Sequence, residues 1–147
     1  LARTAVALGE RVGSRAGQVA ALLTLGRALL AAGDTTQACR THTVVLERAL
    51  ASGNPGTAAD AIDALADVID HHNQPDLAIQ FLGSASAIRA RRNVLVASVA
   101  RDGRLALTGR LSARVGADRF AELESEGRRR DAAWVRDQVE VVIGANA

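Results

Sequence analysis

The sequence predicts an all-α fold, in which antiparallel helix pairs stack as a solenoid and an irregular helical cap follows. Two stretches forty residues apart share one pattern. The first contains Leu22, Leu25, Gly26, Leu29 and Ala38, and the second contains Ile62, Leu65, Ala66, Ile69 and Ala78. Apolar residues at i, i+3 and i+7 share one helical face, and a repeated pair of such helices is typical of solenoids. No segment of useful length shows the two-residue period of a strand.

The chain begins inside an apolar-periodic segment. We interpret residues 1–13 as the end of a preceding helix pair and expect the chain to be part of a longer protein. A break at Gly13-Ser14 separates this segment from a helix predicted over about 16–32. Gly33 ends that helix, because glycine readily adopts the left-handed conformation found after helix ends.

Capping residues define the next two helices. Asp34 is followed three residues later by Gln37, as in a capping box, so a second helix is expected to run to about residue 52. Asn54 can cap a third helix with Pro55 at its first position, and this helix should run to about residue 72.

The repeat decays after the fourth helix, although the boundary residues remain clear. The predicted elements are a fourth helix from Gln74-Pro75 to residue 91 or 92, a linker over about 92–97, a helix ending at Gly116, a short helix from Asp118 to Gly127, and a last helix capped by Asp131. We expect residues 1–92 to form the repeats and residues 93–147 to pack on them as an extension, within a single domain.

Composition narrows the class of protein. All 18 basic residues are arginine, aromatic residues make up 2%, and the net charge is only +2. Cys39 is the single cysteine, which excludes an internal disulfide and fits a reducing compartment. No apolar run is long enough to span a bilayer, so a cytoplasmic protein without a membrane partner is expected.

The repeat register resembles the tetratricopeptide (TPR) pattern. An apolar residue at Leu22, a small one at Gly26, an apolar one at Leu29 and an alanine at Ala38 match that pattern, and the second copy repeats it. The period is forty residues instead of about 34. Aliphatic residues occupy the positions that are aromatic in the family. The resemblance implies a binding module.

A second resemblance covers the C-terminal half. The motifs in order are Phe81-Leu82-Gly83-Ser84-Ala85 with Ile88-Arg89, then Arg114-Val115-Gly116-Ala117-Asp118-Arg119-Phe120, then Glu126-Gly127-Arg128. This set is similar to the tail of the TPR-like region in actinobacterial signalling ATPases and LuxR-type transcriptional regulators. The resemblance implies a non-enzymatic sensor or protein-interaction module of a bacterial regulator, controlling an ATPase and a DNA-binding output.

Two other functions remain open. The chain could be a free-standing TPR scaffold or adaptor, or a helical accessory domain of a signalling enzyme such as a kinase or nucleotide cyclase. An upstream phosphate-binding loop and a downstream helix-turn-helix would favour the regulator. The ligand, the oligomeric state and any regulated genes are not indicated by the sequence.

No residue pattern predicts catalysis, a cofactor or a metal site. A phosphate-binding loop needs a lysine, and the chain has none. His71 and His72 follow Asp67 at a predicted helix end, where histidine suits the helix dipole, and we interpret them as solvated. We expect His42 to face inward as a structural histidine and Cys39 to be a small buried residue.

Two arginine clusters lie at predicted helix ends: Arg89, Arg91 and Arg92, and Arg128, Arg129 and Arg130. Cations are favourable near helix C-termini. Aromatic residues are not interleaved with them, so a structural or solvated role is expected and direct nucleic-acid binding is not.

The sharpest candidate site is an acidic stripe, which is formed by Asp60, Asp63, Asp67 and Asp70. Their spacing of 3, 4 and 3 places all four on one helical face, which the repeat register assigns to the concave groove of the array. Four like charges repel, so a cation should relieve them. We expect at least two of them to be solvent-accessible, Arg27 to approach from the preceding equivalent helix, and the groove to receive a cationic peptide or an Arg-rich part of the parent protein. The alternative is a solvated face, or pairing within the chain with Arg27 and with Arg101 or Arg104.

Overall fold

The computed structural model describes residues 15–145, and every regular element in that range is an α-helix. The helices are α2 (Arg15–Ala31), α3 (Thr35–Ser52), α4 (Pro55–His71), α5 (Pro75–Arg92), α6 (Ser98–Val115), α7 (Ala117–Gly127) and α8 (Ala132–Ala145). The all-α prediction is confirmed. Residues 1–13, which were expected to be the end of a preceding helix pair, lie outside the described residues.

The helix boundaries agree with the predicted ones because the capping residues act as expected. The Asp34 side chain accepts a hydrogen bond from the Gln37 backbone N–H at the start of α3. The Asn54 side chain accepts one from the Thr57 N–H at the start of α4, with Pro55 in the first turn. These bonds satisfy N–H groups that have no partner inside the helix. Gly53, with φ of 66°, ends α3 in the left-handed conformation.

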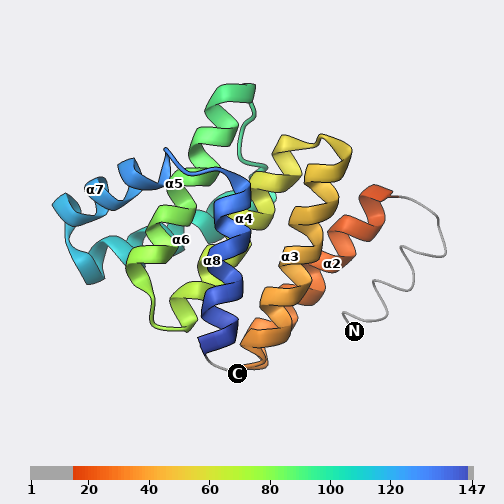
Figure 1. The fold of residues 1–147 in the computed structure, drawn as a ribbon, viewed down its shortest axis with the longest axis horizontal. Coiled ribbons are helices and arrows are strands. Elements are labelled where there is room, and N and C mark those ends of the chain that lie inside the picture. Colours follow the sequence, from red (N-terminus) through yellow and green to blue (C-terminus); the bar gives the residue numbers. More distant parts are fainter. Residues whose placement is uncertain (1–14, 146–147) are drawn as a thin grey trace.

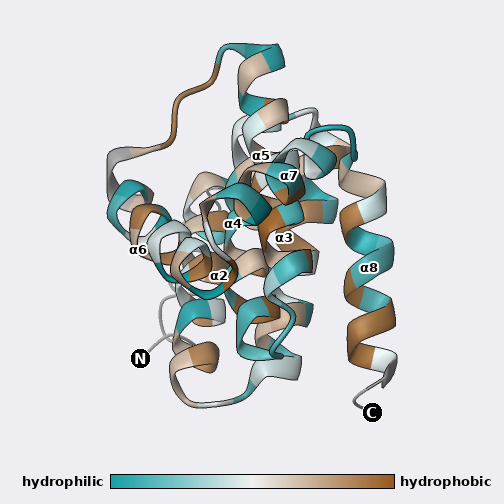
Figure 2. Ribbon diagram, turned by 90° about the vertical axis from the view of Figure 1, so that its left-hand side faces the viewer, coloured by the Kyte–Doolittle hydropathy of each residue, from teal (hydrophilic) through white to brown (hydrophobic). Residues whose placement is uncertain are grey.

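The helices pack as consecutive antiparallel neighbours. α2 packs on α3, α3 on α4, and α4 on α5, while α2 also contacts α4, its equivalent in the repeat. In Figure 1, α2, α3 and α4 follow one another from right to left, and α7 lies at the far left, where it packs on α5. Figure 2 shows α6 at one side of the structure and α8 at the other. α8 packs across α3, α4 and α5, so that side is covered and a helical bundle is the appropriate description.

The core is built from small and aliphatic side chains of α3, α4 and α5. Ala38 and Ala78, the matching alanines of the two copies, are both fully buried. Phe81 adds the largest buried side chain and meets Trp134 of α8 edge-on, with ring centroids 5.8 Å apart. Small residues allow close helix contacts, which is consistent with the low aromatic content.

The closest helix contact joins α5 and α7 through two glycines. A Cβ atom on Gly83 would overlap the backbone oxygen of Glu124, and one on Gly127 would overlap the backbone of Gln80. The Ser84 hydroxyl donates to the carbonyl of Arg130 at 2.9 Å beside this contact. Two of the motifs noted in the sequence therefore form one helix-crossing point.

We expect Gly127→Ala and Gly83→Ala to destabilise the protein, because an added methyl group would force the α5 and α7 backbones apart. Overpacking typically costs about 1–3 kcal/mol, and a backbone clash belongs at the upper end. Gly109→Ala on α6 is the matched control: it has open space around it and should be neutral or stabilising by up to about 1 kcal/mol. Chemical denaturation of the three variants measures the effect. Equal stability of all three would contradict the backbone contact.

Candidate functional site: a charged groove between α2 and α6

The acidic stripe lies on the one face of α4 that the core leaves uncovered. The apolar residues of α4 are buried against its neighbours, so the aspartates at the 3-4-3 positions emerge together on the remaining side. All four are indeed on one face, and three of them, Asp63, Asp67 and Asp70, accept hydrogen bonds from arginines of α6.

The first two aspartates of the stripe, Asp60 and Asp63, form an ion network with the buried Arg89. Arg89 of α5, only 5% exposed, lies 2.8 Å from an Asp60 oxygen and 2.7 Å from Asp63 Oδ2. Arg104 of α6 approaches the same Asp63 oxygen at 3.1 Å from the opposite side. Burial raises the pKa of Asp63, and the Arg104 and Arg89 guanidiniums act against that rise.

Arg104 also joins α6 to α5. Its Nη2 donates to the carbonyl of Leu82 at 3.1 Å and to the hydroxyl of Ser86 at 2.7 Å. With Asp63, these contacts use several donors of one guanidinium in different directions. A lysine ammonium could not make these hydrogen bonds in several directions at once. Arg104 therefore links α6 to both α4 and α5.

The outer half of the stripe is paired with arginines further along α6. Arg110 lies 3.1 Å from Asp67, and Arg114 lies 2.7 Å from Asp70 and donates to the side chain of Asn73 at 2.7 Å. These pairs are much more exposed than those of Arg89. Exposed pairs contribute little individually, but together they align α6 along α4.

The structure corrects the expectation that the stripe is open to a cationic segment. Asp60, Asp63, Asp67 and Asp70 all pair with arginines of this chain, so the internal alternative describes them. Arg104 is the arginine predicted for that alternative. The arginine-rich helix α6 occupies the position that the prediction gave to a cationic partner. Asp60 and Asp67 nevertheless retain solvent exposure, at 29% and 40% of their side chains.

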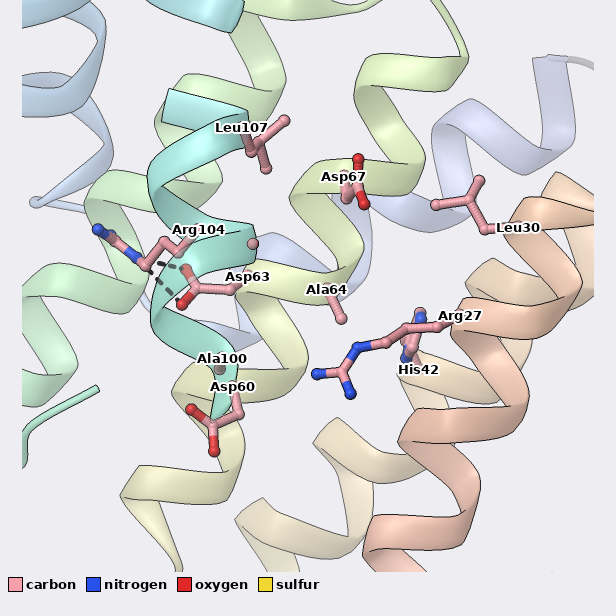
Figure 3. A pocket seen from close by; sticks show the side chains of 11 residues that line it. Arg27, Leu30, His42, Asp60, Asp63, Ala64, Asp67, Ala100, Arg104 and Leu107 are labelled. Carbon is pink, nitrogen blue, oxygen red and sulfur yellow. Dashed lines mark hydrogen bonds and ion pairs between the residues drawn. The ribbon is translucent and has the colours of Figure 1, made fainter. Parts of the chain in front are cut away.

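A groove remains between α2 and α6, with α4 as its floor. Two adjoining cavities of about 330 and 590 Å³ form it and share Arg27, Leu30 and Asp67. The other residues of the smaller cavity are His42, Asp60, Asp63, Ala64, Ala100, Gly103, Arg104 and Leu107. Figure 3 shows Arg27 extending from α2 toward α4, with His42 beside it and Leu107 on the α6 wall.

Arg27 reaches the groove as predicted but does not pair with the stripe. Within the described residues it forms no ion pair with a carboxylate, although it lines both cavities. The aspartates it would meet are already held by Arg89, Arg104 and Arg110. Among the described residues, Arg27 is therefore a positive charge of the groove that no carboxylate neutralises.

His42 is the buried polar residue of the groove, as its inward register predicted. It is only 1% exposed, and its Nδ1 has no hydrogen-bond partner among residues 15–145. Its ring lies directly against Gly26 of α2, where a Cβ atom would overlap it. Burial, and then the positive charge of Arg27, lower the pKa of His42 to about 4. The imidazole is therefore neutral at pH 7.

The cysteine, the other histidines and the second arginine cluster lie outside the acidic stripe. Cys39 is buried, as predicted, and burial raises the pKa of its thiol to about 11, so it stays protonated at pH 7. His71 is about half exposed at the end of α4, as expected for a solvated helix end. His72 does not match that expectation, because it is half-buried and its Nε2 atom is buried. In the second arginine cluster, Arg128 pairs with Glu124 at 3.1 Å, and Arg130 lies over the Trp134 ring.

The partners of the stripe on α6 were not predicted as a set, although the sequence contains a signal for them. Arg104, Leu107, Leu111 and Arg114 repeat the 3-4-3 spacing of the aspartates and therefore share one helical face. Leu107 and Leu111 are buried, while Arg104 and Arg114 reach the stripe. The spacing thus accounts for Arg104 and Arg114, whereas Arg110, which pairs with Asp67, lies outside it.

Comparison with family models, with curated proteins and with solved structures found no match for this chain. Among the described residues, no group of three or more His, Cys, Asp or Glu side chains is arranged to hold a metal ion. None of the helices in residues 15–145 is long and apolar enough to cross a membrane.

We expect Arg89→Met to destabilise the protein far more than Arg110→Met, although both arginines pair with the same stripe. Removing Arg89 leaves buried Asp63 with one cation fewer, and breaking a buried pair typically costs about 3–5 kcal/mol. Arg110 is 52% exposed, so its loss should cost about 0–1 kcal/mol. Urea denaturation compares the two. Similar losses would show that burial does not govern the network.

We expect the stability of the protein to fall as the pH drops from about 6.5 to about 4, partly because of His42. Its pKa is about 4 in the folded chain and 6.5 as the ordinary value, so in this window only the unfolded chain binds the proton. The total loss of stability due to His42 is about 3 kcal/mol once the pH is below 4, and there is no loss above pH 7. Arg27, Asp60, Asp63, Asp67 and Arg104 also face the cavity.

The control for this pH dependence is His42→Gln, since it keeps a polar side chain but does not titrate. Subtracting its free energy of unfolding from that of the parent at each pH cancels the carboxylates and the other two histidines. The difference should change between pH 6.5 and 4 and be flat above. A flat difference throughout would contradict the lowered pKa of His42.

Proposed function

We propose that this chain is a non-enzymatic sensor and protein-interaction module of a bacterial multidomain regulator, built as a TPR-like array. The observation that carries the proposal is the groove. Its floor and its α2 wall come from equivalent helices of the two repeats, α4 and α2, and its second wall is α6. A groove built across repeats is the usual place for partner binding in helical arrays.

The repeat arrangement supports the TPR-like form of this proposal. α2 and α4 lie side by side, while α3 and α5 each pack against their own pair partner. The match between Gly26 and Ala66 gives both equivalent helices a small buried residue at the same position. The covering helix α8 would then be a cap specific to this chain.

The chemical state of the groove favours binding over catalysis. Its carboxylates are engaged by arginines, and the Cys39 thiol, which does not line the groove, is protonated and buried. A catalytic base or nucleophile needs a group poised to exchange a proton near neutral pH. In contrast, fixed charges on rigid helices are suited to recognising a ligand or another domain of the parent protein.

The gene surrounding this segment tests the regulator assignment. A phosphate-binding loop upstream together with a helix-turn-helix downstream is the expected result. Kinase or cyclase motifs would favour an accessory domain of an enzyme instead. A gene encoding only further helical repeats would favour the free-standing adaptor.

We expect a change in the groove to alter the activity of the parent protein. Arg27→Ala should change ATP hydrolysis by the full-length protein, or its response to a partner, within the range of about 5- to 150-fold that typical couplings give. Arg40→Ala removes the same charge from exposed α3 outside the groove and is the control. If both variants hydrolyse ATP like the parent under all conditions, the groove is not the input site.

A further inference from the structure

Among residues 15–145, the charges around the groove include a cation, Arg27, that pairs with no carboxylate. Each aspartate of the stripe has at least one arginine within ion-pair distance, and Asp63 and Asp70 each have two. Arg27 adds a further positive charge, and within the described residues no carboxylate pairs with it. Asp60, Asp63 and Asp67 line the smaller cavity but are held by Arg89, Arg104 and Arg110, so Arg27 is the group there that offers a contact to a negatively charged ligand. This is the opposite sign to the partner suggested by the aspartates alone.

A second and independent polar group faces the same cavity. His42 comes from α3, is almost fully buried, and has a ring nitrogen without a hydrogen-bond partner. Its neutral imidazole carries one N–H donor and one acceptor, and the tautomer is free to adapt to a ligand. A buried polar atom left unpaired is unfavourable, so a ligand that accepts a hydrogen bond from this ring would relieve the cost.

The shape of the cavity limits the size of the ligand. Its volume of about 330 Å³ is at the lower end of the range for small-molecule sites, about 300–1,000 Å³. Leu30 on the α2 wall and Leu107 on the α6 wall provide apolar surface next to Arg27. A ligand with a charged head and a short apolar body would match both kinds of surface.

We infer that this cavity is a binding site for a small organic acid, whose carboxylate or phosphate head ion-pairs with Arg27 and accepts a hydrogen bond from His42. The guanidinium plane of Arg27 can hold two oxygens of such a head at once. The apolar body lies between Leu30 and Leu107. Because Leu107 belongs to α6, a bound ligand contacts both walls of the groove and joins α2 to the helix held by the ion pairs.

This cavity belongs to the groove proposed above as the input site of the regulator. The biological role of the ligand therefore rests on the proposed function. Binding is measured on the 147-residue chain itself. Binding without any effect on the parent protein would overturn the proposed function alone. Absence of binding would overturn this inference alone.

The test is an NMR titration of the chain with butanoate and with inorganic phosphate, at constant ionic strength. Butanamide is the uncharged control ligand. We expect saturable chemical-shift changes of the His42 ring signals with butanoate or phosphate and none with butanamide. The anion that binds more tightly identifies the head group. Equal shifts with butanamide, or none with either anion, would overturn the inference.

Variants locate the site. Arg27→Ala should weaken binding at least ~10-fold, since it removes the charged hydrogen bonds, and Arg27→Lys should restore part of it. Arg40→Ala should bind like the parent. Arg27 is exposed on α2, so these variants should keep the fold, which circular dichroism checks. Equal affinity of Arg27→Ala and Arg40→Ala would rule out this site.

Discussion

Neutralisation of the acidic face of α4 is the interaction on which the arrangement of α6 depends. Four carboxylates on one helical face are unfavourable unless cations reach them. Arg89 supplies the buried part from α5, and Arg104 clamps Asp63 from α6. α6 buries few large apolar side chains, chiefly Leu107 and Leu111. The ion pairs therefore decide where it lies, and its position in turn creates the second wall of the groove.

The other constraint is the crossing of α5 and α7. α5 packs against α4 on one side and α7 on another, and Gly83 and Gly127 let the two backbones touch. This contact is made by touching backbones, in contrast to the contact of α6 with α4, which is made by charged side chains. α6 is thus joined by a single residue, Gly116, to an element that is firmly held, while its own attachment depends on charge.

The groove combines these two kinds of contact. Its floor on α4 belongs to the rigid core, and its α6 wall is held by ion pairs that salt screens wherever they are exposed. A ligand that contacts Arg27 and Leu107 would add attraction between the walls. Such a site can report ligand binding through the position of one helix, which is the property that the proposed sensor needs.

The helices and their ends follow from the sequence alone, because caps and apolar periodicity are local properties. Asp34, Asn54 and the breaks at Gly33 and Gly53 mark boundaries that the structure confirms. The shared face of the aspartates is also local, since it follows from spacing within one helix. Their partners depend on which helices lie opposite: Arg89 on α5 pairs with Asp60, and arginines of α6, 41 to 44 positions away, pair with the other three. Only the tertiary structure decides that the acids are neutralised and that Arg27 is left over, because both depend on long-range packing.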